Sequence, residues 1–155
     1  MRGSRGWRVV VVPLSGALLA GGALLAGCAS TGITATRLER ALGPTFANLI
    51  QTQGTLLGLA PVDVPALHVS AACHRIGPGT DDKGGGDWLC TVQWSPPGYR
   101  GVWHDSYDVS VTNDGCYTAT ADGEEGHLGG PRLARRDGAT VTNLLYAFDG
   151  CFDPT

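Results

Sequence analysis

Apolar side chains recur every three or four residues between Thr34 and Leu57, which is the spacing of one face of an α-helix. The positions on this stripe are Leu38, Leu42, Phe46, Leu49, Ile50, Gln53 and Leu57. Thr34 or Thr36 can cap the first turn through its hydroxyl. Pro44 follows Gly43 in the middle of the segment, and proline both lacks an N–H and clashes with an earlier carbonyl. The pattern therefore predicts a kinked helix, or two short ones, packed on a core.

Apolar and polar residues alternate in segments 67–74 and 87–94, as in strands with one buried face. The residues between them are rich in glycine and aspartate, which is typical of a loop. A hairpin centred on residues 81 and 82 places Cys73 opposite Cys90. The same register adds two apolar pairs on that face, Ala71 with Val92 and Val69 with Trp94. A shift of one residue would break all of these pairs, so the register is well specified.

A second hairpin is predicted from residue 103 onward, where the alternation resumes. We interpret Asn113-Asp114-Gly115 as a three-residue loop that closes with Gly115 in the left-handed region. That register makes three inward pairs: Val111 with Tyr117, Val109 with Ala119, and Tyr107 with Ala121. A two-residue Asp-Gly turn would pair Val111 with Thr118 instead, which is a poorer match.

The C-terminal part is less clearly patterned. Residues 122–131 indicate a mobile acidic loop, and residues 140–148 fit either a short strand or a helical turn. Cys116 falls on the outer face of the second hairpin, so a bond to Cys151 requires the tail to fold back across the sheet or around its edge. We therefore predict one α+β domain over residues 34–155: an N-terminal helix on a four-stranded antiparallel meander, with two disulfides and a C-terminal segment folded back over the sheet.

The first 27 residues differ from the rest and predict a signal peptide. Three arginines precede an apolar run from Val9 to Ala26, which is short and glycine-rich for a transmembrane helix. The run ends in Leu25-Ala26-Gly27-Cys28, which resembles the lipobox of bacterial lipoproteins. The resemblance implies attachment of a diacylglyceryl group with palmitate-type chains to the sulfur of Cys28, cleavage before Cys28, and residues 28–33 as a lipidated tether. It places the mature chain on the extracytoplasmic face of the cell membrane, held by the lipid and without a transmembrane helix.

Charge and cysteine content agree with an exported domain. Residues 28–155 carry eight basic and fourteen acidic side chains, a net charge of −6, which disfavours nucleic acid as a partner. Beside Cys28, the even set Cys73, Cys90, Cys116 and Cys151 predicts two disulfides. The first hairpin pairs Cys73 with Cys90 and leaves Cys116 for Cys151. A zinc site with His68 and His74 is the alternative, but adjacent strand residues face opposite ways and no C-x-x-C spacing occurs.

Catalytic motifs are missing from the sequence, and we expect no catalytic residue, metal or cofactor. His104-Asp105-Ser106 invites a triad interpretation, but strand neighbours point to opposite faces. Glu124, Glu125 and His127 could ligate a metal, yet hard ligands on a glycine-rich loop are usually just solvated.

The aromatic residues around the turn at 95–101 are the more interesting candidates. Tyr99 and Trp103, with His104, could contact a ligand or partner, whereas the alternative is that the aromatics cap the end of the core. The lipobox, D-W-x-C, Y-x-V-x-V-x-x-D-G-C-Y and F-D-G-C-F-D together resemble small actinobacterial lipoproteins, a resemblance that implies no activity.

We therefore expect a non-enzymatic binding module that contacts an exported protein or a cell-envelope glycan. One alternative is an inhibitor that docks loop 95–103 into an exported hydrolase. The other is a hydrolase in which His104 and Asp108 converge in the fold.

Overall fold

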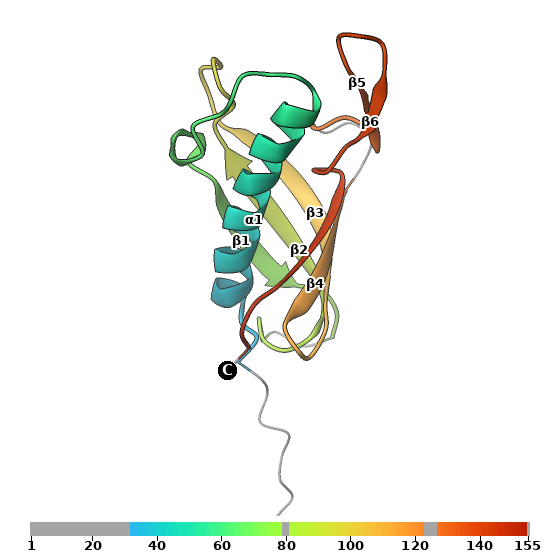
Figure 1. Ribbon diagram of the computed structural model, residues 1–155. Helices are drawn as coiled ribbons and strands as arrows, with labels where there is room; N and C mark the ends of the chain where they lie inside the picture. The colour runs from blue at the N-terminus through green and yellow to red at the C-terminus, as the bar shows by residue number, and fades with distance from the viewer. Residues whose placement is uncertain (1–31, 79–80, 123–126, 155) are drawn as a thin grey trace, which may run out of the picture.

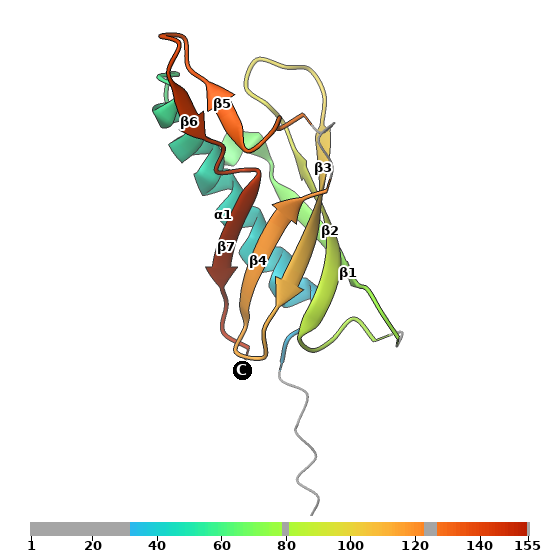
Figure 2. The same ribbon diagram turned by 90° about the vertical axis from the view of Figure 1, so that its right-hand side faces the viewer.

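The α+β class predicted for the domain is confirmed by the computed structural model, which describes residues 32–78, 81–122 and 127–154. The elements in chain order are α1 (Ala35–Leu56), the 3-10 helix η1 (Pro65–Leu67), β1 (Ser70–Arg75), β2 (Gly86–Trp94), β3 (Trp103–Val111), β4 (Cys116–Ala121), β5 (Arg132–Ala134), β6 (Thr140–Thr142) and β7 (Ala147–Cys151). Five strands form an antiparallel sheet in the order β1-β2-β3-β4-β7, and β5 and β6 form a separate hairpin. Helix α1 covers one face of the large sheet (Figures 1 and 2).

Helix α1 is one continuous helix of 22 residues, so of the two predicted alternatives the pair of short helices is wrong. Thr34 caps it, since its hydroxyl oxygen accepts a hydrogen bond from the N–H of Arg37 at 3.3 Å. Pro44 lies on the exposed side of the helix, as does Arg40, whose carbonyl loses its usual donor. Water can reach that carbonyl, which explains why the helix tolerates the proline.

The core lies between α1 and the inner face of the sheet. Its largest fully buried side chains are Trp88, Tyr107, Phe46, Ile33, Leu38, Leu42, Leu67, Val92, Val109, Asn143 and Cys90. Phe46 of the helix contacts the rings of Trp94, Tyr107 and Phe148, with centroid distances of 5.8, 6.0 and 6.4 Å. The predicted helix stripe therefore packs on the predicted strand face.

Both predicted hairpin registers are confirmed. Cys73 lies opposite Cys90 and Ala71 opposite Val92, while the second hairpin pairs all three predicted residue couples. Gly115 closes the second loop at φ +84°, in the left-handed region. A Cβ at this position would lie 2.3 Å from the carbonyl oxygen of Phe152, so the loop requires glycine here for two reasons.

The C-terminal segment returns along the edge of the sheet and forms a fifth strand, β7, beside β4. The sheet thus has five strands rather than the four predicted for the meander. Backbone pairing with β4 satisfies the hydrogen-bonding groups of both segments, and Phe148 of β7 joins the core. Hairpin β5–β6 lies within the part whose structure the pattern left open, and its turn contains Asp137-Gly138, with Gly138 at φ +83°.

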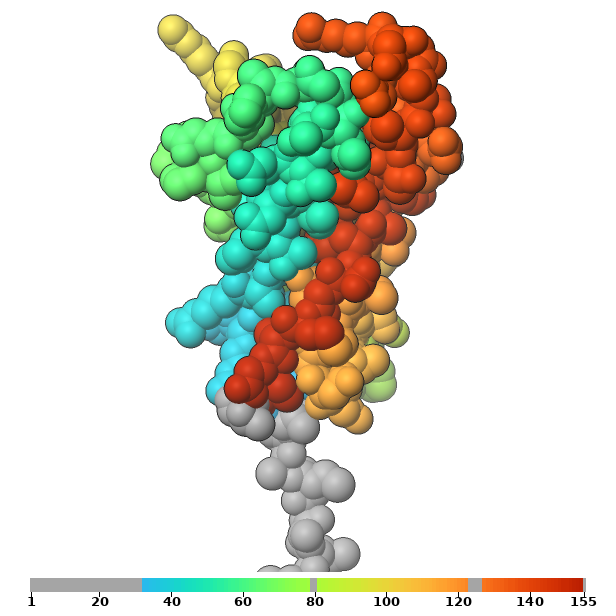
Figure 3. All heavy atoms as spheres, viewed as in Figure 1, coloured from blue at the N-terminus to red at the C-terminus, as the bar shows by residue number. Residues whose placement is uncertain are grey.

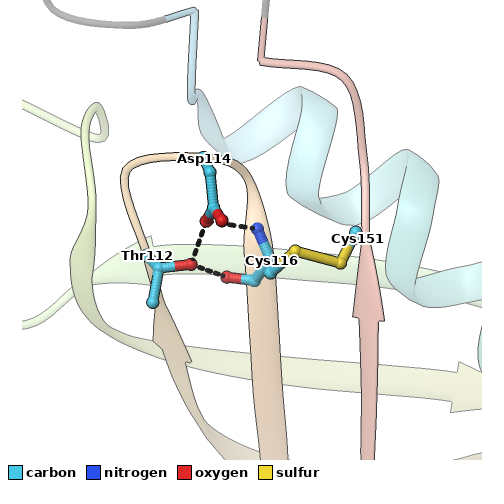
Figure 4. The surroundings of a disulfide bond; sticks show 4 residues. All are labelled: Thr112, Asp114, Cys116 and Cys151. Carbon is cyan, nitrogen blue, oxygen red and sulfur yellow. Dashed lines mark hydrogen bonds between the residues drawn. A yellow bond between two sulfur atoms is a disulfide. The ribbon is translucent and has the colours of Figure 1, made fainter.

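Both predicted disulfides are present, Cys73–Cys90 and Cys116–Cys151. Figure 4 shows the second one beside the β3–β4 loop. There the hydroxyl of Thr112 donates to the carboxylate of Asp114, which also accepts the N–H of Cys116 at 3.3 Å. Both hydrogen bonds lower the pKa of Asp114, and the bond from Thr112 has the larger effect.

Edge strand β1 is protected by carboxylates. The N–H of Cys73 donates to Oε1 of Glu39 at 2.9 Å, and the N–H of Arg75 donates to Oδ1 of Asp82 at 3.0 Å. These bonds occupy donors that could otherwise pair with another chain. Across the described residues, no helix is long and apolar enough to span a membrane.

Candidate binding site

The domain has two chemically different ends. At one end, helix α1 begins close to the C-terminal segment, and Arg37 donates to the carbonyl oxygen of Asp153 at 3.4 Å (Figure 1). We call this the terminal end. At the other end lie loop 95–102 and hairpin β5–β6, which project from the surface in Figure 3 in yellow and orange-red. We call it the distal end. The 22 residues of α1 separate the two ends by about 33 Å, at about 1.5 Å per residue.

Three aromatic side chains run from the core to the surface at the distal end. Trp94 and Trp103 are opposite each other on β2 and β3, with ring centroids 5.1 Å apart in an edge contact. Tyr99 contacts Trp103 in the same manner, at 5.5 Å. Trp94 is buried, Trp103 is half-buried and Tyr99 is 58% exposed. Trp94 and Trp103 therefore close the end of the core, whereas Tyr99 belongs to the surface.

The loop that carries Tyr99 is attached to the domain at its start. The N–H of Ser95 donates to the carbonyl of Leu67 at 2.7 Å, and Pro96 is buried. The N–H of Tyr99 then donates to the carbonyl of Pro96 at 3.2 Å, which makes a tight turn. Val102, at 53% exposure, adds apolar surface beside the tyrosine. This end of the domain thus presents an apolar loop with a defined backbone.

Asp105 is the unexpected residue of the site. It points inward from β3, two residues after Trp103, and is only 4% exposed. The indole N–H of Trp94 donates to its Oδ2 at 2.8 Å. Its Oδ1 is also buried but has no hydrogen-bond partner within residues 32–78, 81–122 and 127–154. An unmade bond of this kind costs on the order of 1–3 kcal/mol and requires an explanation. The buried Nε2 of Gln53 and Nε1 of Trp88 also lack a partner among the described residues, but Asp105 is the acidic group of the three.

His127 covers that free oxygen without bonding to it. Its Nδ1 lies 3.7 Å from Oδ1 of Asp105, beyond hydrogen-bond distance. Its ring stacks on Trp103 with a centroid distance of 4.6 Å and an interplanar angle of 20°. The side chain is 51% exposed, so the imidazole forms a lid between the carboxylate and the solvent.

The segment after His127 is held by a buried asparagine. Nδ2 of Asn143 donates to the carbonyls of Leu128 and Gly130 at 2.8 and 2.9 Å. Its Oδ1 accepts the N–H of Leu145 at 3.1 Å. Leu128 is itself buried, so this half of the segment that was expected to be a mobile loop is packed on the domain.

A small cavity of about 200 Å³ opens beside Asp105. Its walls are His104, Asp105, Ser106, Ala121, Asp122, Leu128 and Gly129. Because His104, Asp105 and Ser106 are consecutive on β3, their side chains point to alternate faces of the sheet, and the wall of the cavity is largely polar. Such a lining favours a cation or a hydrogen-bond donor over an apolar ligand.

Tyr107 completes the buried polar group. Its hydroxyl donates to the carbonyl of Leu145 at 2.7 Å. Burial raises the pKa of this phenol well above its ordinary value, and the neighbouring charge of Asp105 raises the pKa further. The phenol therefore acts as a structural hydrogen-bond donor.

The structure brings together two of the three predicted contact residues. Tyr99 and Trp103 are neighbours, whereas His104 faces the opposite side of β3 and lines the cavity instead. His104 and Asp108 share the outer face but are four residues apart, or about 13 Å along a strand. This separation does not favour a shared catalytic role. Cys28, Glu124 and Glu125 lie outside the described residues, and the described part holds no group of three metal-ligating side chains.

The sequence suggested Asp105 only as part of a triad and His127 only as a metal ligand, and their contacts with Trp94 and Trp103 were missed, although the sequence carries a signal for one of them. Alternation along 103–111 puts Asp105 on the same side as Trp103 and Tyr107, and a carboxylate at an inward position needs a partner. No comparable pattern marks His127, because its place depends on the packing of a distant segment.

Comparison with known proteins gives no match to a protein-family model, a curated protein or a solved structure.

Proposed function

We propose that this protein is a lipid-anchored, extracytoplasmic binding module that contacts a partner protein through its distal end. One observation carries the proposal: the exposed aromatic group of Tyr99, Trp103 and His127 lies at the end of the domain opposite the point where residue 32 enters it. Half-buried aromatic side chains on a defined backbone are typical of the energetically important centres of protein interfaces.

The anchor and the contact surface fit together geometrically. Ile33 is buried in the core, so the tether is shorter than the predicted residues 28–33 and would hold the terminal end near the lipid headgroups. The distal end would then face outward, about 33 Å away along α1. The net charge of −6 on residues 28–155 supports this orientation, because an anionic membrane surface repels an acidic domain.

Crosslinking in intact cells with the Cys28 anchor retained, followed by mass spectrometry, tests this proposal. We expect one reproducible protein partner, lost in Tyr99→Ala and Trp103→Ala. Ile76→Ala is the matched control, because Ile76 is an exposed apolar side chain (48%) on the loop after β1, away from the distal end. Absence of any partner, or equal loss in the Ile76→Ala variant, would overturn the proposal.

Membrane attachment is tested separately with Cys28→Ser. We expect the wild-type chain to partition with membranes and to incorporate labelled palmitate. The serine variant should do neither, because it lacks the thiol that accepts the lipid. Equal membrane retention of both forms would contradict the anchor.

A second candidate function is inhibition of an exported hydrolase by loop 95–102. The attached backbone of this loop and its exposed Tyr99 and Val102 favour it, since protein inhibitors present a pre-organised loop. Slower turnover by a hydrolase recovered in the crosslinking experiment, restored by Tyr99→Ala, would support inhibition. Unchanged turnover would leave only the binding role.

A further inference from the structure

We propose that Trp103 and Asp105 form a binding site for an arginine side chain of the partner protein, and that His127 occupies this site while the partner is absent. The inference deepens the proposed function, and it depends on the distal end being the contact surface. It starts from the carboxylate of Asp105, which is 4% exposed and has one oxygen without a hydrogen-bond partner among the described residues.

The position of His127 shows what kind of group the site accepts. A planar ring lies against the face of Trp103, 4.6 Å between centroids and tilted by 20°, with one nitrogen aimed at Oδ1 of Asp105. At 3.7 Å this nitrogen is too far away to donate a hydrogen bond. The imidazole therefore fills the aromatic side of the site but leaves the carboxylate unsatisfied.

A guanidinium group satisfies both sides at once. It is planar and stacks on an indole face, and it carries a permanent charge and several N–H donors in one plane. With its plane against Trp103, one edge can donate to Oδ1 of Asp105 while the indole of Trp94 keeps its bond to Oδ2. Lysine fits less well, because its ammonium group is compact, strongly hydrated and not planar.

The surroundings of the site also favour a cation. A further acidic residue, Asp122 just after β4, is among the residues that line the adjoining cavity of about 200 Å³. Residues 28–155 carry an excess of six negative charges. His127 is held by its stack on Trp103 and by the 3.7 Å ion-pair contact with Asp105, and its side chain is 51% exposed, so an arginine that makes both contacts can displace it.

A peptide titration of the full-length protein in detergent at low ionic strength tests the inference. The probe is acetyl-Gly-Arg-Gly-amide, and the readout is the NMR signal of the Trp94 indole N–H, which is bonded to Asp105. We expect this signal to shift in a saturable manner, with at least threefold weaker binding of the lysine peptide and none of the citrulline peptide. The buried Trp88 indole signal should stay in place and report that the domain is folded.

Three variants make the test specific. Asp105→Asn keeps the shape and the acceptor for Trp94 but removes the charge, so binding should weaken at least tenfold. His127→Ala removes the competing ring and should strengthen binding about threefold. Asp108→Asn changes an exposed carboxylate on the outer face of the same strand, and binding should stay within twofold.

The outcomes separate this inference from the proposed function. Binding of the citrulline peptide, or an unchanged affinity in folded Asp105→Asn, overturns the arginine site. If Asp105→Asn does not fold, His127→Ala decides, because weaker binding in that variant overturns it. A failed titration together with Trp103-dependent crosslinking rejects the arginine site and keeps the binding module. A successful titration without any crosslinked protein supports the site and rejects the protein partner.

Discussion

The terminal and distal ends of this domain satisfy their polar groups to different degrees. At the terminal end, the Cys116–Cys151 disulfide joins β4 to β7, and Asp114 binds both a hydroxyl and a backbone N–H beside it. At the distal end, one oxygen of the buried Asp105 carboxylate has no hydrogen-bond partner among the described residues and makes only a 3.7 Å contact with the half-exposed His127. Two aromatic side chains continue from this histidine to the surface.

This difference indicates a division of labour. The Cys116–Cys151 disulfide and the hydrogen bonds of Asp114 stabilise the terminal end without offering anything to a ligand. An unpaired buried oxygen costs stability and is retained where a binding partner supplies the missing group. Damage to the terminal end should therefore lower stability and spare binding, and damage to the distal end should affect binding most.

The largest effect on stability is expected from removing the terminal disulfide in Cys116→Ala/Cys151→Ala. The bond closes a loop with a sequence separation of 35 residues, so loop entropy predicts a loss of about 4 kcal/mol in the free energy of unfolding. Urea unfolding measures this loss, and Trp103-dependent crosslinking should persist at temperatures where the variant is folded. A loss below about 1 kcal/mol would contradict the stabilising role of this end.

Asn143→Ala should affect both properties, because Asn143 holds the segment next to His127. It removes three buried hydrogen bonds at about 1 kcal/mol each, for a loss of about 3 kcal/mol. We also expect a changed near-UV circular dichroism signal from Trp103 as the stacked imidazole is released. Asn113→Ala in the exposed β3–β4 loop is the matched control and should change stability by less than about 0.5 kcal/mol. Equal effects of the two variants would reject this role of Asn143.

Tyr107→Phe should lower the free energy of unfolding by about 2 kcal/mol, since the buried carbonyl of Leu145 loses its donor. Burial raises the pKa of Tyr107 above its ordinary value near 10. Above that pH the unfolded chain loses the phenolic proton more readily than the folded one, so wild-type stability falls as pH rises. Urea unfolding between pH 8 and 11 should show that the free energy of unfolding falls less steeply with pH in the variant than in the wild type. Parallel pH profiles for the two proteins would show that Tyr107 does not contribute.

The smallest effect is expected from Asp114→Asn. The pKa of Asp114 is lowered by Thr112 first and by the N–H of Cys116 second, so its charge stabilises the fold above the ordinary value near 3.9. That contribution disappears as the pH falls through the lowered pKa. Thermal melts measured from pH 7 to pH 2 should show a smaller loss of stability on acidification in the variant than in the wild type. If the two proteins lose the same stability on acidification, the Asp114 carboxylate has no role in stability.

The sequence predicted the elements that have one buried face. In both main hairpins, alternation with a period of two placed apolar pairs opposite each other, so the register and the Cys73–Cys90 bond followed from it. Hairpin β5–β6 escaped prediction because its strands have three residues each and hardly any buried side chain that could mark a face. The sequence did not decide whether the C-terminal segment crosses the sheet or pairs at its edge as β7 does. Alternation within a strand does not determine which strand lies beside it.

The candidate site was predictable only in part, for a related reason. Tyr99 and Trp103 are close in sequence and flank one turn, so local pattern was enough to find them. The contact of Trp103 with His127 joins residues that are 24 positions apart. It depends on Asn143, which is farther along the chain and holds the segment that follows His127. Single-sequence periodicity contains no information about such a contact.

The order of the disulfides has a consequence for how the chain matures. Among the four cysteines of the described domain, each bond joins one cysteine to the next in sequence, Cys73 to Cys90 and Cys116 to Cys151. A chain oxidised progressively from its N-terminus therefore reaches the native pairing by joining each arriving thiol to the one before it. Thiol exchange has no incorrect pair to undo along that route. If the chain is exported N-terminus first and the lipid occupies Cys28, we expect an oxidant alone to produce the native pairing.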